Sequence, residues 1–462
     1  MELFNNLSPL DHRYYLSSPD LAKELRNYLS EEAVIRSEAL AEGALVKALY
    51  KAGLCSLDVV KEVEEAVLNI CPQEVYEEEQ KTQHNIRALV NCIRNHVSDD
   101  AKPWVHFTAT SLDIMDSAAS YRYKKVTEEV VLKRLIDLEK TLIKLARENA
   151  QVLQMGRTHG QHAVPITFGF ALALYVERLG ERIVFINEAS QKLTAKLAGA
   201  VGAYNASSLV VENPLQLEAD YALELGLKPA AISTQIVPPE ATLDLFHGYV
   251  SAFGVLANLA DDMRHLQRSE IGEVFEYFGK TQVGSSTMPH KRNPWNFEHV
   301  KSLWKSFMPR MTTIYMDQIS EHQRDLSNSA SARFYGEIIA GLCLAAERLN
   351  RVLSRIRVDE EAMIRNFNQS AQMVIAEPLY ILLADVGHPD AHECVRQLTL
   401  ESQKTQKTLW QLIEEDKELV AMLSKLPVER LDVIKDPRKY TGLSAQKTMM
   451  ICKKWENMIE EV

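Results

Sequence analysis

The sequence predicts an all-α protein, with three helical domains organised around a long central helical bundle. The first observation behind this fold class is that apolar residues recur at steps of three and four over several long stretches. The second is that strand-like patterns are few and short, for example at Ser208–Val211. Apolar residues at this spacing form one stripe along a helix, and such stripes pack helix against helix at a shallow angle, as in bundles.

Three stretches show the stripe most clearly. Their apolar positions are Leu135, Leu138, Leu142 and Leu145; Leu172, Val176, Leu179, Ile183 and Ile186; and Ile338, Leu342, Ala345, Leu349, Val352 and Ile356. Burial in a hydrophobic core is the simplest explanation of this pattern. We therefore expect these residues to form the core of the bundle.

Segments that contain glycine or proline separate the helical stretches and suggest domain boundaries. Pro103–Ser111 ends the first helical region, and Arg357–Asp359 begins the last, with Asp359 as its expected N-cap. Gly279–Pro294 is a long segment with few large apolar residues and a dense basic group. We predict an N-terminal helical domain at 1–110, a central long-helix bundle domain at 111–357 and a C-terminal helical domain at 358–462.

Composition limits the functions open to the chain. With 52 Lys and Arg against 63 Asp and Glu, the net charge is −11, which argues against general nucleic-acid binding because that requires a basic face. A local group of cations can still bind an anionic substrate. The six cysteines form no CxxC pair, the N-terminus lacks a secretory pattern, and no apolar run approaches the ~20 residues that span a bilayer. These features predict a cytoplasmic protein without a membrane or nucleic-acid partner.

The sequence carries no recognisable metal or cofactor motif. Its thirteen histidines include no HExxH, and neither a Walker loop nor a dinucleotide fingerprint is present. His388 and His392 have the i, i+4 spacing of a metal-binding pair, but Pro389 and the lack of an adjacent ligand motif favour a structural role. We expect neither a metal nor a cofactor.

The most informative segment is Gly284–Pro294, with the sequence GSSTMPHKRNP. It is a glycine- and proline-containing loop with two adjacent serines followed by His290, Lys291 and Arg292, and such a loop can close over an anion. A serine acts as a base only where neighbouring groups stabilise its alkoxide. A solvated basic loop without function explains the same composition equally well.

This segment resembles the GSSxMPxKxNP signature of the fumarase/aspartase superfamily, and every fixed position of that signature is present. The resemblance implies a lyase that eliminates fumarate or a related product from a succinyl-type substrate. It also implies a homotetramer whose central helices join in a larger bundle.

A second segment, Met155–Pro165, places His159 between Thr158 and Gly160 on a polar turn between helices. A lone histidine is usually structural. The segment, however, resembles the THG motif of the adenylosuccinate lyases, a branch of the superfamily in which this histidine is the general acid. Argininosuccinate lyases and fumarases are similar here but carry THxQ, and carboxymuconate cycloisomerases usually lack the histidine.

A third segment, Thr108–Asp113, predicts a helix start. Thr110 is a suitable N-cap, and Asp113 stands three residues later, as in a capping box. This structural role is expected whatever the function. The resemblance adds that Thr110 and Ser111 hold a substrate carboxylate, which the amide groups of a helix N-terminus favour.

Two further segments resemble the phosphate-binding parts of adenylosuccinate lyases. Ser8–Tyr14 is similar to SPxDGRY, with a histidine in place of the usual glycine, and the resemblance implies that Arg13 and Tyr14 contact the nucleotide. Arg324–Arg333 is similar to RDxSxSxxxR, and a solvated helix start with an ion pair is the alternative. Arginine and hydroxyl donors suit a phosphate. The implied phosphate ligands of this second segment are Arg324, Ser329 and Arg333.

Weaker resemblances add four substrate-binding residues. Gln235 matches a glutamine that meets the substrate, and His84 matches a histidine of the family. Asn85 stands where aspartate is usual, and Gln83 where some members have arginine. A carboxylate at position 85 would have raised the basicity of neighbouring groups, which an amide does not do.

The implied reaction is a β-elimination, with Ser285 as base, Ser286 as its backup and His159 as acid. Lys291 and Asn293 would stabilise the dianionic intermediate, and Glu298 would orient the histidine and keep it protonated. The implied substrates are adenylosuccinate and the succinyl-aminoimidazole-carboxamide ribotide of purine biosynthesis. The resemblance further implies active sites shared between three subunits.

Two other hypotheses are weighed against this one. Another lyase of the superfamily, acting on argininosuccinate or a carboxymuconate lactone, is disfavoured by the phosphate-binding segments and by His159–Gly160. A non-catalytic helical scaffold recruited from the superfamily is disfavoured because Ser285, His159, Lys291 and Asn293 are all present.

Overall fold

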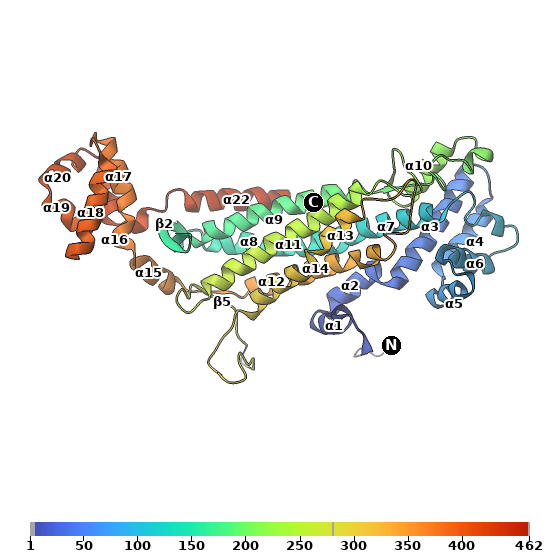
Figure 1. Cartoon of the computed structure of the whole chain (residues 1–462), viewed down its shortest axis with the longest axis horizontal. Coiled ribbons are helices and arrows are strands. Elements are labelled where there is room, and N and C mark those ends of the chain that lie inside the picture. Colours follow the sequence, from blue (N-terminus) through green and yellow to red (C-terminus); the bar gives the residue numbers. More distant parts are fainter. Residues whose placement is uncertain (1–4, 280, 461–462) are drawn as a thin grey trace.

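The computed structural model describes residues 5–279 and 281–460 and shows an elongated helical molecule (Figure 1). Short helices gather at one end, long helices run through the middle, and a second group of short helices lies at the opposite end. The predicted all-α class with a long central bundle is confirmed.

The N-terminal helices pack as adjacent pairs, with α3 against α4 and α5 against α6. Their bounds are α1 Arg13–Ser17, α2 Pro19–Leu29, α3 Glu31–Lys51, α4 Leu57–Leu68, α5 Pro72–Thr82 and α6 Asn85–Asn95. Serine side chains begin the two longest of them: Ser30 accepts the N–H of Ala33, and Ser56 accepts that of Val59. Such N-caps satisfy amide groups that the helix itself leaves unpaired.

The central bundle is built from the long helices that the apolar stripes predicted. Its helices are α7 Ser111–Val126, α8 Leu132–Glu148, α9 Phe168–Ser190, α11 Glu240–Leu266, α12 Trp295–Phe307, α13 Arg310–Met316 and α14 Tyr335–Leu353. A π-helical turn at Thr127–Val131 joins α7 to α8, and α10 (Pro214–Glu224) packs on α3. The predicted stripe residues are buried, apart from Ile356, which is partly buried against the same core.

The C-terminal region forms a second hydrophobic core between Ile375 and Ile434. Its helices are α15 Glu360–Asn368, α16 Ala371–Val374, α17 Ala376–Asp385, α18 Ala391–Thr405, α19 Leu409–Glu415, α20 Lys417–Leu423 and α21 Val428–Lys435. Asp359 caps α15 as predicted, because its side chain accepts the N–H of Ala362.

The last helix, α22 (Ser444–Met458), leaves this region and packs along α8 and α9 of the bundle. Trp455 is fully buried there, directly over Gly180, where any Cβ atom would lie 2.3 Å from the indole ring. The predicted domain boundaries at 110 and 357 remain a proposal, and α22 shares its core with the central helices.

Short strands connect the helices. An antiparallel hairpin is formed by β1 Leu153–Thr158 and β2 Gln161–Thr167; β3 Thr194–Ala195 pairs in parallel with β4 Lys228–Pro229; and β5 Val274–Phe275 pairs antiparallel with β6 Arg357–Val358. The strand predicted at Ser208–Val211 is wrong. Ser207–Leu209 is a 3₁₀ turn, and the exposed Leu209 and Val210 have no sheet to pack against.

Candidate active site

The loop Gly284–Pro294 lies between β5 and α12 in the chain, leads directly into α12, and projects from the side of the bundle (Figure 1). Within it, the Oγ of Ser285 accepts the backbone N–H of Thr287 at 3.3 Å and that of Met288 at 3.0 Å. Hydrogen bonds donated to an oxygen favour its ionised form. The Oγ of Ser285 accepts two such backbone hydrogen bonds within the loop.

Contacts between the two ends of this loop hold it together. The Nδ2 of Asn293 donates to the carbonyl of Gly284 at 3.0 Å. A Cβ atom on Gly284 would lie 2.0 Å from the carbonyl oxygen of Lys291, so the close approach requires glycine. The side chains of Ser286 and Lys291 are exposed. Asn293 thus has a structural contact that the sequence did not predict, in addition to its expected role.

His159 lies at the tip of the β1–β2 hairpin. His159 and Gly160 have φ values of 54° and 75°, and they form the two-residue loop between the paired Thr158 and Gln161. Hairpins favour turns with positive φ at both central residues because such turns match the twist of the strands. The sequence predicted only a polar turn at this position. The structure instead presents the exposed His159 and Thr158 on a defined hairpin.

The N-terminus of α7 is firmly anchored. The N–H of Thr110 donates to Asp113 Oδ2 at 2.8 Å, which confirms the predicted capping relation. The buried carboxylate of Asp113 also binds the ammonium group of the buried Lys196 and accepts the N–H of Ala198 at 3.1 Å. Thr110 and Ser111 are half-buried at this end of the helix, where an anion is favoured.

Two more predicted residues lie close to α7. The N–H of Gln235 donates to the carbonyl of Gln323, next to Arg324. Burial raises the pKa of Asp116 on α7 to about 6, and the nearby Arg324 charge opposes that rise. The Nε of Arg324 is buried and has no hydrogen-bond partner among residues 5–279 and 281–460. A buried donor without a partner costs free energy, so an acceptor on a bound ligand would stabilise it.

The segment between α5 and α6 faces the same helix. Asn85 donates through Nδ2 to the Sδ of Met115 on α7, at 3.7 Å. Gln83 ends α5 in the left-handed conformation, and the Nδ1 of His84 caps α6 by accepting the N–H of Arg87 at 3.3 Å. Both side chains are exposed. Of these three residues, only Asn85 has a contact with α7 among the hydrogen bonds of the described residues.

The two predicted phosphate-binding segments lie apart. The hydroxyl of Tyr14 is hydrogen-bonded to His299 Nε2 of α12 at 3.2 Å, and Arg348 of α14 is near Tyr14. Arg333 precedes the first residue of α14, Tyr335, so at about 1.5 Å per residue Arg348 is roughly 20 Å further along the helix. The predicted phosphate ligands with exposed side chains are Arg13, Ser329 and Arg333.

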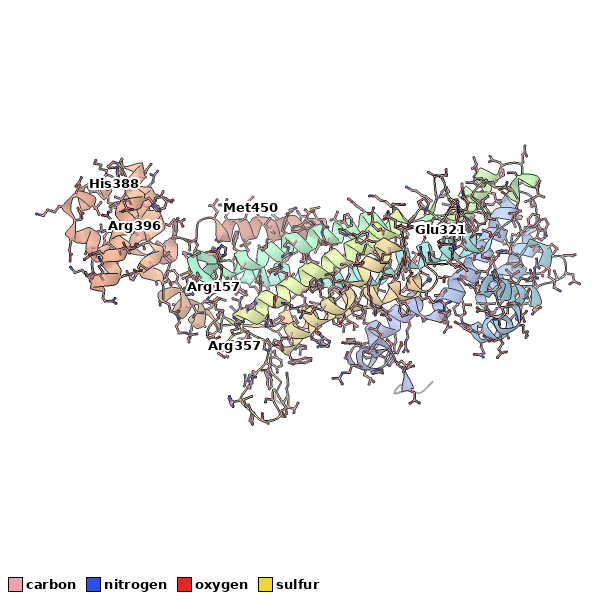
Figure 2. The ribbon with its side chains drawn as sticks, viewed as in Figure 1. Arg157, Glu321, Arg357, His388, Arg396 and Met450 are labelled. Atoms are coloured by element: carbon pink, nitrogen blue, oxygen red, sulfur yellow. The ribbon has the colours of Figure 1, made fainter. Side chains whose placement is uncertain are left out.

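One chain does not bring all predicted site residues together. In Figure 2, Arg157, two residues before His159, lies at one end of the bundle, and Glu321, close to Arg324, lies near the other end. Within the described part of the chain, no hydrogen bond or ion pair joins His159 to the exposed Glu298. The predicted orientation of this histidine by Glu298 is therefore not seen within the single chain.

A buried pair before Thr110 was missed in the sequence. The Nδ1 of His106 donates to Glu42 of α3 at 2.6 Å, and Glu42 is fully buried. Burial disfavours the charged imidazole, but the Glu42 carboxylate outweighs it and raises the pKa of His106. His106 and Thr108 both have a φ of 65°, which is uncommon for residues other than glycine. In the sequence, the break at Pro103–Ser111 was the only sign of an unusual segment here. Glu42 could not be identified as the partner of His106, because the two residues are distant in the sequence.

His388 and His392 make ordinary structural contacts. His388 Nδ1 accepts the N–H of Asp390 at 3.1 Å, and the ring of His392 packs against Tyr380. Within residues 5–279 and 281–460, no group of three or more His, Cys, Asp and Glu side chains is arranged to hold a metal ion. Across the same residues, no helix combines the length and the apolar character needed to cross a bilayer.

Comparison with known proteins shows where the chain belongs. A lyase family model matches residues 12–306, and a model of the adenylosuccinate lyase C-terminal region matches residues 320–435. The chain is 32% identical to the adenylosuccinate lyase of Pyrococcus horikoshii over 460 residues, which is 98% of each protein. The chain belongs to the adenylosuccinate lyase family. It is also 30% identical to the adenylosuccinate lyase of Archaeoglobus fulgidus, over 98% of this chain and 99% of that relative.

Solved structures agree on the fold. The 3-carboxy-cis,cis-muconate lactonizing enzyme of Pseudomonas putida matches with a TM-score of 0.81 and 23% identity, over 94% of this chain and 97% of that one. A fumarate lyase from Mesorhizobium sp. BNC1 matches with a TM-score of 0.81 and 22% identity, over 93% and 97%. At this level of identity the likeness establishes a shared fold and does not distinguish the reactions.

Proposed function

We propose that this protein is an adenylosuccinate lyase that cleaves adenylosuccinate to AMP and fumarate. The same elimination would act on the succinyl-aminoimidazole-carboxamide ribotide of purine biosynthesis. The observation that carries the proposal is the loop Gly284–Pro294, in which two backbone amides donate to Ser285 Oγ. The substrate is proposed from the family assignment, and the base is proposed from the loop.

In the proposed mechanism, the Ser285 alkoxide removes a proton from the succinyl carbon next to a carboxylate. The electron pair moves into that carboxylate, and the intermediate carries two negative charges on it. Lys291 and Asn293 would stabilise this dianion, and Ser286 contributes a neighbouring hydroxyl. The pair then forms the carbon–carbon double bond of fumarate while the carbon–nitrogen bond breaks.

His159 would protonate the leaving nitrogen, with Thr158 beside it on the hairpin and Glu298 of another subunit keeping the imidazole charged. This assignment is supported by the exposure of His159 at the hairpin tip, where a substrate bound between subunits can reach it.

The rest of the substrate would be held from the other end of the bundle. Thr110 and Ser111 would bind a succinyl carboxylate at the N-terminus of α7. The Nε of Arg324, which has no hydrogen-bond partner in the described part of the chain, supports a phosphate ligand in that region. The other proposed substrate contacts are Arg13, Tyr14, Gln83, His84, Asn85, Gln235, Ser329 and Arg333.

We infer a cytoplasmic homotetramer whose active sites are shared between three subunits. The supporting observation is that Arg157, two residues before His159, lies at one end of the bundle, whereas Glu321, close to Arg324, lies near the other end (Figure 2). Residues so far apart in one chain can meet only if another copy supplies the missing groups.

The first test follows ultraviolet absorbance when the purified protein meets adenylosuccinate, with argininosuccinate in a parallel reaction. We expect prompt conversion of adenylosuccinate to AMP and fumarate and none of argininosuccinate. Turnover of argininosuccinate alone would contradict the nucleotide assignment of Arg13, Arg324 and Arg333, while leaving the elimination chemistry of the loop intact.

The second test mixes two inactive variants, His159→Gln and Ser285→Ala, after gentle dissociation and reassociation of the subunits. If each site takes these residues from different chains, random mixing restores both native groups to about a quarter of the sites. Each variant reassociated alone is the control. A mixture as inactive as its components would mean that one chain supplies both residues to a site.

A further inference from the structure

Two segments that are distant in the sequence, β1 and α15, converge on one fully buried carboxylate, that of Glu273. Gln154 of β1 donates to its Oε2 at 2.8 Å, and Asn366 of α15 donates to its Oε1 at 2.9 Å. Arg157, also of β1, makes a bidentate contact, from Nη2 to Oε1 at 2.6 Å and from Nη1 to Oε2 at 3.3 Å. Each carboxylate oxygen therefore accepts two hydrogen bonds.

Glu273 is itself held at a fixed place in the backbone. Its N–H donates to the carbonyl of Leu266, the last residue of α11, and its carbonyl accepts the N–H of Asp359, both at 2.9 Å. It immediately precedes β5, the last strand before the loop Gly284–Pro294. The carboxylate is thus anchored to the end of a long bundle helix.

Arg157 lies only two residues before His159, at the outer end of β1. The strand is irregular here, because the register shifts between Met155 and Arg157, and a Cβ on Gly156 would lie 2.5 Å from the carbonyl of Val164. A bulge of this kind changes the direction of a strand and weakens its ladder. The hairpin tip therefore depends on side-chain contacts for its orientation.

We propose that Glu273 is a positioning residue for His159, because its bidentate contact with Arg157 sets the direction of the β1–β2 hairpin. This inference rests on the proposed function, in which His159 protonates the leaving nitrogen. A planar guanidinium with two parallel hydrogen bonds to a carboxylate fixes orientation as well as distance, which a single ammonium contact does not do.

A change in the direction of the hairpin would move the imidazole of His159 away from the leaving nitrogen. A displacement of about 1 Å at a reacting group can lower the rate by ~10²-fold. Substrate affinity would change little, because the carboxylate and phosphate contacts proposed above come from other segments. A positioning role therefore predicts a lower kcat at nearly constant KM.

The test compares Arg157→Lys and Glu273→Gln with the control Arg357→Gln, all in the full-length protein. Arg357 lies on β6, next to β5, and its guanidinium contacts Asp359 at 2.9 Å while its side chain is 69% exposed (Figure 2). The control therefore removes an arginine–carboxylate contact in the same region without touching the hairpin.

We expect both test variants to lower kcat by ~10²-fold with KM within about twofold of wild type, and the control to match wild type. Without substrate, hydrogen–deuterium exchange at residues 158–161 should be faster in the test variants and unchanged in α9. Arg157→Lys keeps a positive charge opposite the buried Glu273 carboxylate. If Glu273→Gln does not fold, the Arg157→Lys variant alone tests the proposal.

Two results would overturn the inference. One is unchanged hairpin exchange in Arg157→Lys, since the contact would then not control the hairpin. The other is faster exchange with wild-type kcat, since the hairpin direction would then not matter to catalysis. The exchange measurement needs no turnover, so its result stays separate from a failure of the wild-type protein to cleave adenylosuccinate.

Discussion

Replacing Ser285 with alanine is expected to lower kcat by about 10²–10⁴-fold, the usual contribution of a positioned general base. The substitution removes the atom that takes the proton in the proposed mechanism, whereas the carboxylate and phosphate contacts remain. Substrate affinity should therefore stay close to wild type. Steady-state kinetics with adenylosuccinate, together with equilibrium binding of AMP, measure the two effects separately.

Loss of the Ser285 hydroxyl should leave the fold intact. The amides of Thr287 and Met288 lose their acceptor, but both residues are exposed, so water can replace it at small cost. Thr287→Ala is the matched control in the same loop and should keep near-normal kcat. Should Ser285→Ala turn over normally while Ser286→Ala is inactive, the base would be Ser286.

Replacing Asp113 with alanine is expected to lower the free energy of unfolding by about 3–5 kcal/mol, the usual cost of breaking a buried ion pair. Lys196 is fully buried and would lose its charged partner. The amides of Thr110, Ala198 and Gly199 would lose an acceptor as well. Thermal and urea unfolding at matched protein concentration measure the loss.

The control for Asp113 is an exposed ion pair, Glu148 with Lys144 on α8, at 3.9 Å and with side chains 59% and 75% exposed. Glu148→Ala should change the free energy of unfolding by less than about 1 kcal/mol, because solvent screens such pairs. An Asp113→Ala variant no less stable than Glu148→Ala would show that this buried network does not stabilise the start of α7.

Local features of the structure were predictable from the sequence. The stripes of α8, α9 and α14 were correctly assigned to the core, because helical periodicity depends only on residues a few positions apart. The caps at Thr110 and Asp359 were found for the same reason. The family was also recognised, because Gly284–Pro294 is a contiguous motif.

The hairpin at His159 was not predicted, although its residues are contiguous. Its strands are short, the register is shifted at Gly156, and Pro165 interrupts the pattern of β2. A histidine before glycine is also a weaker hairpin signal than asparagine before glycine. The strand β1 packs against α15, which is distant in the sequence, and this contact cannot be predicted from the local residue pattern.

The sequence by itself determined the helical class, the buried faces of α8, α9 and α14, the caps at Thr110 and Asp359, and the identity of the chemical groups. Only the tertiary structure decided which groups meet: Glu42 with His106, Asp113 with Lys196, and Glu273 with Arg157. It also decided that Arg157, two residues before His159, and Glu321, close to Arg324, lie toward opposite ends of the bundle. The physical reason is that any buried carboxylate requires a partner, which follows from its chemistry alone. Which distant cation lies close enough to pair with it depends on long-range packing.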